Sequence, residues 1–126
     1  MFGLSVRWSL ADAAPGTADK LREYVVGTSL ARFTGMAGLH FKTWRMLEGE
    51  WFEGTYVFAT REDRDQFLAG FIPGEANAPG TLLTGSTPIA YEPFEVVAVA
   101  EGGAGFVSGA GPGSSLTAEG DGGQQR

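Results

Sequence analysis

The side chains best suited to chemistry lie on two neighbouring predicted strands, residues 39–46 and 51–59. A purely structural strand pair is rich in Val, Ile and Thr, whereas these segments carry His, Lys, Tyr and two Trp among apolar residues. Because side chains alternate across a strand, we expect His40, Lys42 and Trp44 on one face of the sheet. An imidazole, an amine and an indole on one half-buried face indicate the wall of a pocket.

The turn between these strands determines which residues meet. If the turn is centred near Gly49, Lys42 lies opposite Tyr56 on the neighbouring strand. A lysine in a pocket can stabilise an enolate or a phenolate, and a tyrosine hydroxyl can donate a hydrogen bond to a substrate oxygen. His40 is the only histidine, and imidazole is the natural general base at neutral pH. The candidate catalytic residues are therefore His40, Lys42 and Tyr56.

Aromatic side chains are the candidates for substrate binding. Their rings can stack on a flat, hydrophobic or aromatic substrate. Trp44 is the strongest candidate because it shares the face of Lys42. The residues assigned to substrate binding are Trp8, Trp44, Phe58, Phe67 and Phe71.

Each candidate also has a purely structural interpretation. A lysine ordinarily buries its stem and keeps its ammonium in water. A tyrosine or tryptophan more often fills the core. For His40, the structural interpretation is preferred: a partly exposed polar residue at the start of its strand. A role as an axial haem ligand has no supporting motif.

Composition excludes several classes of protein. The net charge of −6 argues against nucleic acid or an anionic membrane as a partner, because both require a basic patch. Without cysteine, the chain has no thiolate chemistry and no disulfide, and one histidine cannot form a histidine-rich metal site. No apolar run approaches the length of a membrane span. We expect a soluble cytoplasmic protein with no metal and no cofactor.

Hydrophobic periodicity and turn residues predict the elements. Thr60 is a suitable N-cap for the second helix, and Pro73 ends it. Residues 74–88 are rich in Gly and Pro and are predicted to be a long loop, either a lid over the pocket or partly disordered. The predicted regular elements are a strand over 2–10, a helix over 17–33, the strand pair, a helix over 60–73 and a strand over 89–100.

This β-α-β-β-α-β order predicts a ferredoxin-like α+β domain over residues 1–102, with an antiparallel sheet. Residues 103–126 are rich in Gly and Ser and are predicted to be a disordered tail. The sheet face away from the helices carries apolar residues, among them Leu39, Phe41 and Val57, so we expect a second copy to cover it in a homodimer. Arg7 and Arg45 are expected in ion pairs at that interface. The acidic residues Glu48, Glu50 and Glu53 are expected to be solvated.

One motif carries a family resemblance. It consists of K-x-W at Lys42 and Trp44, followed by G-x-Y-x-F at Gly54, Tyr56 and Phe58. With the segment 93–102, it resembles the YdhR-type monooxygenases of the dimeric α+β-barrel superfamily, which includes the antibiotic-biosynthesis monooxygenases.

The resemblance implies a dimeric α+β barrel with a pocket between sheet and helices in each subunit. Better-known relatives oxidise aromatic polyketides without metal, flavin or haem. Lys42, Trp44, Tyr56 and Phe58 match the motif, whereas the asparagine that some relatives have on the first strand is absent from residues 4–8.

Three functions fit these observations. The first is a cofactor-independent monooxygenase acting on an aromatic or enolisable, polyketide-like small molecule. The second is a cyclase or isomerase of such a molecule, using the same pocket. The third is a non-catalytic protein that binds a small ligand.

Overall fold

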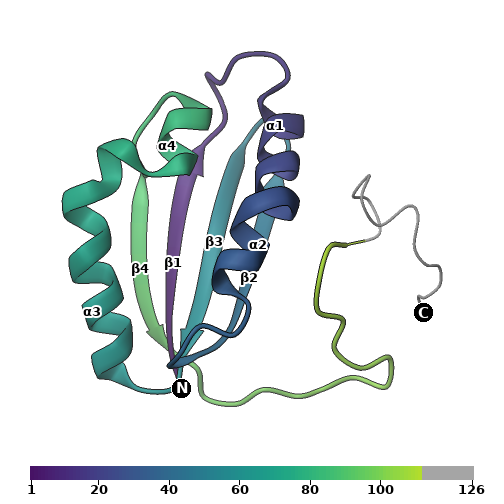
Figure 1. The fold of residues 1–126 in the computed structure, drawn as a ribbon, viewed down its shortest axis with the longest axis vertical. Helices are drawn as coiled ribbons and strands as arrows, with labels where there is room; N and C mark the ends of the chain where they lie inside the picture. The colour runs from purple at the N-terminus through teal and green to yellow at the C-terminus, as the bar shows by residue number, and fades with distance from the viewer. Residues whose placement is uncertain (112–126) are drawn as a thin grey trace.

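The structure, a computed structural model, describes residues 1–111. Its elements follow one another along a single domain (Figure 1). In chain order they are β1 (Phe2–Ser9), α1 (Thr17–Tyr24), the π-helical turn η1 (Val25–Ser29), α2 (Leu30–Phe33), β2 (Leu39–Leu47), β3 (Trp51–Phe58), α3 (Arg61–Phe71), the 3-10 helix η2 (Ile72–Asn77), α4 (Pro79–Thr84) and β4 (Ala90–Glu95).

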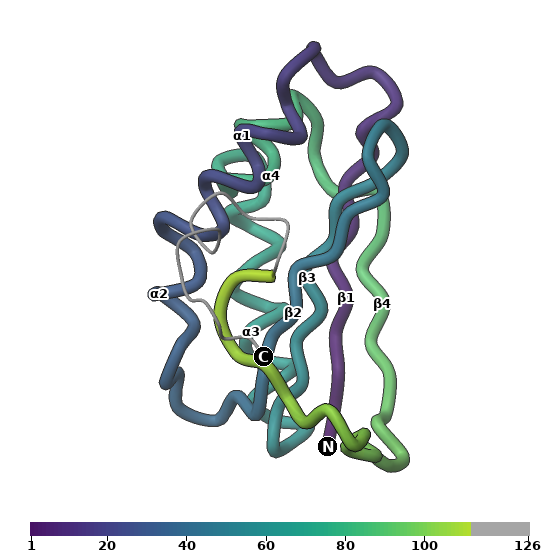
Figure 2. Tube along the Cα trace, turned by 90° about the vertical axis from the view of Figure 1, so that its right-hand side faces the viewer, coloured from purple at the N-terminus to yellow at the C-terminus, as the bar shows by residue number. Residues whose placement is uncertain are grey.

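The four strands form one antiparallel sheet in the order β2-β3-β1-β4. The helices lie together on one side of this sheet, as the edge-on view of Figure 2 shows. The predicted ferredoxin-like α+β fold is therefore confirmed. The central strand β1 pairs on both sides, and its Leu4, Val6 and Trp8 are buried beneath the helices.

The first helical segment is interrupted where its residues have the lowest helix propensity. The predicted helix over 17–33 is present, but it contains the π-helical turn η1, and Gly27 lies inside that turn. Glycine favours such irregular backbone because it stabilises a regular helix poorly. The second helix begins as predicted, because the Thr60 hydroxyl accepts a hydrogen bond from the backbone N–H of Asp63 at 3.1 Å.

Two predicted elements differ from the structure. Residues 74–88 are not a loop, because η2 and α4 occupy most of this segment and Pro79 starts α4 at a position where proline fits a helix. The last strand ends at Glu95 rather than at residue 100, and residues 96–111 form no further helix or strand. The tail predicted over 103–126 lies partly outside the described residues, which end at residue 111.

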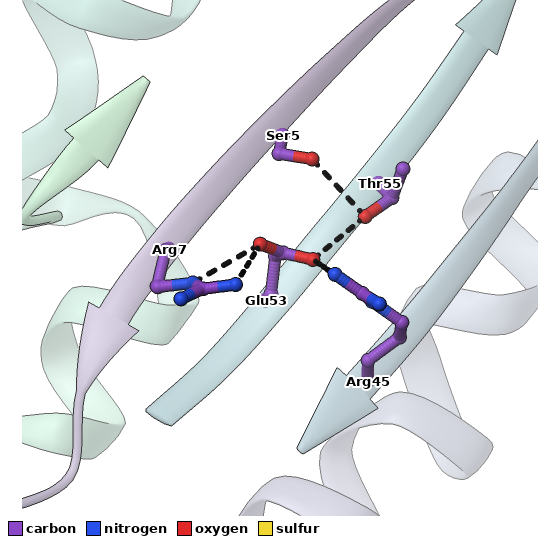
Figure 3. A network of polar contacts seen from close by, with 5 residues as sticks. All are labelled: Ser5, Arg7, Arg45, Glu53 and Thr55. Atoms are coloured by element: carbon purple, nitrogen blue, oxygen red, sulfur yellow. Dashed lines mark hydrogen bonds and ion pairs between the residues drawn. The ribbon is translucent and has the colours of Figure 1, made fainter. Parts of the chain in front are cut away.

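The sheet face away from the helices holds a buried carboxylate (Figure 3). Glu53 is only 1% exposed, so the expectation that it is solvated is wrong. Arg7 donates two hydrogen bonds to one carboxylate oxygen, at 3.1 and 2.9 Å, and Arg45 donates to the other through Nε at 2.9 Å. Thr55 also donates to that oxygen at 2.9 Å, and its hydroxyl lies 3.3 Å from the Ser5 hydroxyl.

This network determines the charge of Glu53. Burial by itself raises the pKa of the carboxyl group, but the hydrogen bonds from Arg45, Thr55 and Arg7 outweigh burial and lower the pKa below its ordinary value. Trp51 covers the network, with the Arg7 guanidinium 4.4 Å from its ring centre. The predicted ion pairs of the two arginines therefore form within one chain.

Homodimerisation stays a prediction. Val57 is already buried within one chain, but the segment after β4 crosses below the sheet with its apolar side chains largely exposed (Figure 1). Val97 is 90% exposed and Phe106 is 68% exposed.

Light scattering of the purified protein is expected to give twice the mass of one chain. The mass of a single chain over the working concentration range would contradict the prediction.

Replacing Glu53 by Gln is expected to lower the free energy of unfolding by about 1–3 kcal/mol at pH 7, because a neutral amide leaves two arginines without their carboxylate. The folded pKa lies below the unfolded value of about 4.3, so this stabilisation exists above that pH and is lost as the pH falls through the folded pKa. Urea unfolding at pH 7 and pH 3 measures the difference in free energy of unfolding between the wild type and Glu53→Gln. This difference should be smaller at pH 3. Glu50→Gln, at an exposed position, is the control. An equal loss at both pH values would contradict the assignment.

Candidate functional site

A small pocket lies between the sheet and the helices that cover it. Its floor is formed by Lys42 and Trp44 from β2 and by Tyr56 from β3. The helices close it from above, with Phe33 on α2 and Phe67 on α3. The cavity measures about 50 Å³, which is far less than the roughly 300–1,000 Å³ of a site that encloses a drug-sized ligand. In this conformation the pocket holds a few non-hydrogen atoms rather than a multi-ring molecule.

Lys42 lies directly opposite Tyr56 in the antiparallel register, as predicted. Its amine nitrogen lies 3.7 Å from the ring centre of Phe33, 4.3 Å from that of Tyr56 and 4.6 Å from that of Trp44. Among the described residues, none of those lining the pocket is an Asp or a Glu, and no carboxylate forms an ion pair with Lys42. The amine is therefore surrounded by aromatic rings without a counter-ion.

These surroundings change the protonation of Lys42. Burial disfavours the ammonium form, and the nearby guanidinium of Arg32 repels it, so the pKa of Lys42 falls to about 6. At pH 7 the side chain is mostly a neutral amine. A neutral amine accepts protons and attacks carbonyl carbons, whereas an ammonium does neither.

Tyr56 remains a phenol. Burial raises the pKa of its hydroxyl, Arg32 partly opposes this shift, and Tyr24 adds to it. A phenol with a raised pKa keeps its proton at neutral pH and can donate a hydrogen bond to an oxygen. The pocket therefore contains a base and a hydrogen-bond donor side by side.

Gly54 provides the space in which these two groups converge. A Cβ atom at this position would lie 3.2 Å from Cε of Lys42 and 3.4 Å from the Tyr56 hydroxyl oxygen. Any side chain would therefore crowd both groups. The glycine of the G-x-Y-x-F motif thus serves the geometry of the site as well as the strand.

His40 is separated from the other candidate catalytic residues. A β-bulge between Leu39 and Phe41 adds one residue to β2, so that Leu39 pairs with Phe58 and His40 has no partner in the ladder. His40 is exposed and does not line the pocket. The same bulge leaves Leu39 packed against the core beneath the helices. The prediction that Leu39 lies on the outer face of the sheet is therefore wrong.

The structure brings most of the predicted substrate-binding residues together. Trp8, Trp44, Phe67 and Phe71 line the pocket. Phe58 does not line it, but its ring stacks on that of Tyr56, with ring centres 6.2 Å apart. Phe58 is therefore placed to support the wall behind Tyr56 rather than to touch a ligand.

The first helical segment contributes lining residues that were not predicted from the sequence. They are Tyr24, Ser29, Arg32 and Phe33. Tyr24 and Ser29 are five residues apart, and they reach the same pocket because the π-helical turn lies between them. A regular helical period brings residues three or four apart together, so it does not pair these two positions.

The segment after α3 closes the pocket, with Ala78, Pro79 and Gly80 in its lining. Trp8 holds this segment, because its indole N–H donates a hydrogen bond to the Thr81 hydroxyl at 3.0 Å. The backbone of Gly80 lies against the indole, where an added Cβ would come within 2.7 Å of the ring.

Within residues 1–111, no group of three or more His, Cys, Asp or Glu residues is arranged to hold a metal ion. No helix in this part of the chain is long and apolar enough to cross a membrane.

Comparison with known proteins gives similarity of fold. No protein-family model and no curated protein matches the chain. The crystal structure of NE2512, a protein of unknown function from Nitrosomonas europaea, is similar with a TM-score of 0.59 and 23% identity, over 79% of this chain and 91% of that chain. A putative antibiotic biosynthesis monooxygenase from Chloroflexus aurantiacus J-10-fl is similar with a TM-score of 0.50 and 20% identity, over 79% and 95% of the two chains. The chain thus has the α+β fold of these proteins.

The depressed pKa of Lys42 predicts how stability depends on pH. An unfolded lysine binds its proton up to about pH 10.4, whereas folded Lys42 releases it near pH 6. Between these values the unfolded state binds more protons, so the free energy of unfolding is expected to rise by about 1 kcal/mol per pH unit.

Urea unfolding between pH 6 and pH 9 measures this slope. The variant Lys42→Met should lack it, because methionine does not titrate. Lys20→Met is the matched control, since Lys20 is exposed, and should keep the slope. Parallel curves for the wild type and Lys42→Met would show that the lysine is not buried as described.

Proposed function

We propose that the protein removes a proton from an enolisable aromatic small molecule and passes the resulting carbanion to dioxygen, as a cofactor-independent monooxygenase. The observation that carries this proposal is the amine of Lys42, enclosed by three aromatic rings without a carboxylate. The K-x-W and G-x-Y-x-F resemblance and the fold shared with the putative antibiotic biosynthesis monooxygenase of Chloroflexus aurantiacus support the choice of reaction.

Lys42 acts as the general base in this mechanism. Its neutral amine accepts the carbon-bound proton, and the ammonium that forms lies against the faces of Phe33, Trp44 and Tyr56, which attract cations. The new ammonium also pairs with the substrate anion. Because His40 lies outside the pocket, Lys42 takes the role of general base that was predicted for the histidine.

Tyr56 stabilises the anion by donating its hydroxyl hydrogen bond to the enolate or phenolate oxygen. Trp44 offers a flat surface for the substrate ring. The carbanion then adds to dioxygen, and the peroxide anion takes the proton from the Lys42 ammonium. This transfer regenerates the neutral amine. The hydroperoxide then loses water, which takes the second hydrogen of the reacting carbon and the outer peroxide oxygen with its proton, and a carbonyl group remains at that carbon.

Substrate entry requires the pocket to widen. A cavity of about 50 Å³ accommodates the reacting end of a substrate but not a fused ring system. The segment that carries Ala78–Gly80 forms one wall, and two side-chain hydrogen bonds hold η2 and α4 to the sheet, from Trp8 to Thr81 and from Tyr91 to Glu75. The lid predicted over residues 74–88 therefore corresponds to η2 and α4, which would move outward as a unit.

A cyclase or isomerase is the second candidate. The neutral amine of Lys42 and the protonated hydroxyl of Tyr56 form a base and an acid on one side of the pocket, which is the pair that proton relocation requires. Product mass separates the two reactions, because oxygenation adds oxygen whereas isomerisation leaves the mass unchanged. Binding without chemical change would instead identify the third candidate, a ligand-binding protein.

Deuterium exchange tests proton removal. With 1,3-dihydroxynaphthalene, a phenol that is enolisable at the ring carbon between its hydroxyl groups, the wild type is expected to accelerate loss of deuterium from that carbon. The rate should rise as the pH increases through about 6, because Lys42 must be neutral to accept a proton. Oxygen uptake measured in parallel reports the second step.

Lys42→Met is expected to reduce the exchange rate by about 100-fold or more, and Tyr56→Phe is expected to reduce it less. Lys20→Met should exchange at the wild-type rate. Normal exchange in Lys42→Met would remove the lysine from the mechanism. Exchange without oxygen uptake, under air, would favour the isomerase.

A further inference from the structure

We propose that Lys42 forms an imine with small carbonyl compounds that carry a carboxylate, so that the pocket binds 2-oxo acids covalently. Lys42 and Lys20 are the only lysines of the chain, and Lys42 alone lines the pocket. This inference uses the site of the proposed function but not its reaction, since no oxygen is consumed.

The surroundings of the amine favour attack on a carbonyl carbon. No carboxylate lines the pocket among the described residues, so no ion pair holds the amine as an ammonium. The rings of Phe33, Trp44 and Tyr56 surround the nitrogen and limit the access of water. Both features keep a lysine nucleophilic, and the low pKa of Lys42 agrees with them.

Tyr56 is placed to assist the loss of water. The lone pair of the Lys42 amine forms a carbon–nitrogen bond as the carbonyl oxygen accepts a proton, which gives a carbinolamine. The hydroxyl group of this intermediate then leaves as water with a second proton, and the carbon–nitrogen double bond forms. The Tyr56 hydroxyl and Cε of Lys42 both border the space that Gly54 leaves open, so the hydroxyl can donate a hydrogen bond to the departing oxygen there.

Arg32 determines the preference for an acid. It lines the pocket from α2, and its guanidinium carbon lies 4.8 Å from the Phe33 ring centre. Its charge acts on both Lys42 and Tyr56. Within residues 1–111, Arg32 forms no ion pair with a carboxylate of the chain. Arg32 is exposed, and the carboxylate of a bound substrate would pair with its guanidinium in place of water.

The size of the cavity agrees with a small ligand. About 50 Å³ holds a carbonyl group and its neighbouring atoms without movement of the pocket walls. A 2-oxo acid places its carbonyl one bond from its carboxylate, so both can lie within the region bounded by Lys42 and Arg32. A short chain such as that of pyruvate or glyoxylate therefore fits best.

Reductive trapping tests the proposal. The protein is incubated at pH 7 with pyruvate and sodium cyanoborohydride, which adds hydride to the imine carbon and leaves a stable secondary amine. Intact mass and peptide mapping then locate the adduct. We expect one reduced pyruvate unit, with at least tenfold more label on Lys42 than on Lys20. Adding urea to unfold the chain should abolish this preference.

Variants separate the roles of the residues. Lys42→Met should lose the adduct, and Lys20→Arg should keep it. Arg32→Gln should lower the ratio of the pyruvate labelling rate to the acetone labelling rate at least fivefold, because any change in the Lys42 amine affects both compounds and only pyruvate carries a carboxylate. Equal labelling of the two lysines in the folded wild type, or no adduct at all, would overturn the proposal.

This experiment is independent of the exchange assay with 1,3-dihydroxynaphthalene. Trapping without exchange would support imine formation and contradict the proposed proton removal. Exchange without trapping would contradict imine formation alone.

Discussion

The antiparallel register between β2 and β3 is the constraint on which the pocket depends. The turn at Gly49, where φ is 82°, starts the ladder with Leu47 opposite Trp51. The pairing then runs without a shift to Lys42 and Tyr56. Because side chains alternate, a slip of one residue on β2 would turn Lys42 to the outer face of the sheet and Arg45 to the inner face, away from Glu53. The short turn thus determines the chemistry of both faces.

The same two strands maintain two opposite electrostatic environments. On the outer face, Glu53 receives hydrogen bonds from two arginines and remains ionised despite its burial. On the inner face, Lys42 has only aromatic neighbours and a nearby positive charge from Arg32, so it becomes neutral. The difference follows from the partners and not from depth alone, because Glu53 is the more deeply buried of the two and still keeps its charge. A carboxylate on the inner face would restore the ammonium and remove the basic amine.

The parts of the site that depend on regular periods could be predicted from the sequence. Alternation along the strands and the turn at Gly49 were sufficient to place Lys42 opposite Tyr56. The position of His40 could not be predicted, because the bulge that displaces it adds one residue without a distinctive residue type. The helices within residues 72–84 were missed because Gly and Pro, which usually indicate loops, lie here at the ends of short helices. Arg32 was missed because a π-helical turn precedes it, and this turn shifts the residues beyond it out of the regular helical period.

That π-helical turn has a consequence for how the chain tolerates insertions and deletions. It holds one residue more than a regular helical turn, so it behaves as an insertion accommodated within a helix. Removing one residue near Gly27 would let the helix run regularly, and the part beyond it would rotate by about 100° relative to the part before it. Arg32 and Phe33 would then turn away from Lys42, although the sheet would keep its register. A single-codon deletion far from β2 would therefore remove the guanidinium and one ring from the pocket, while leaving its floor of strand residues in place.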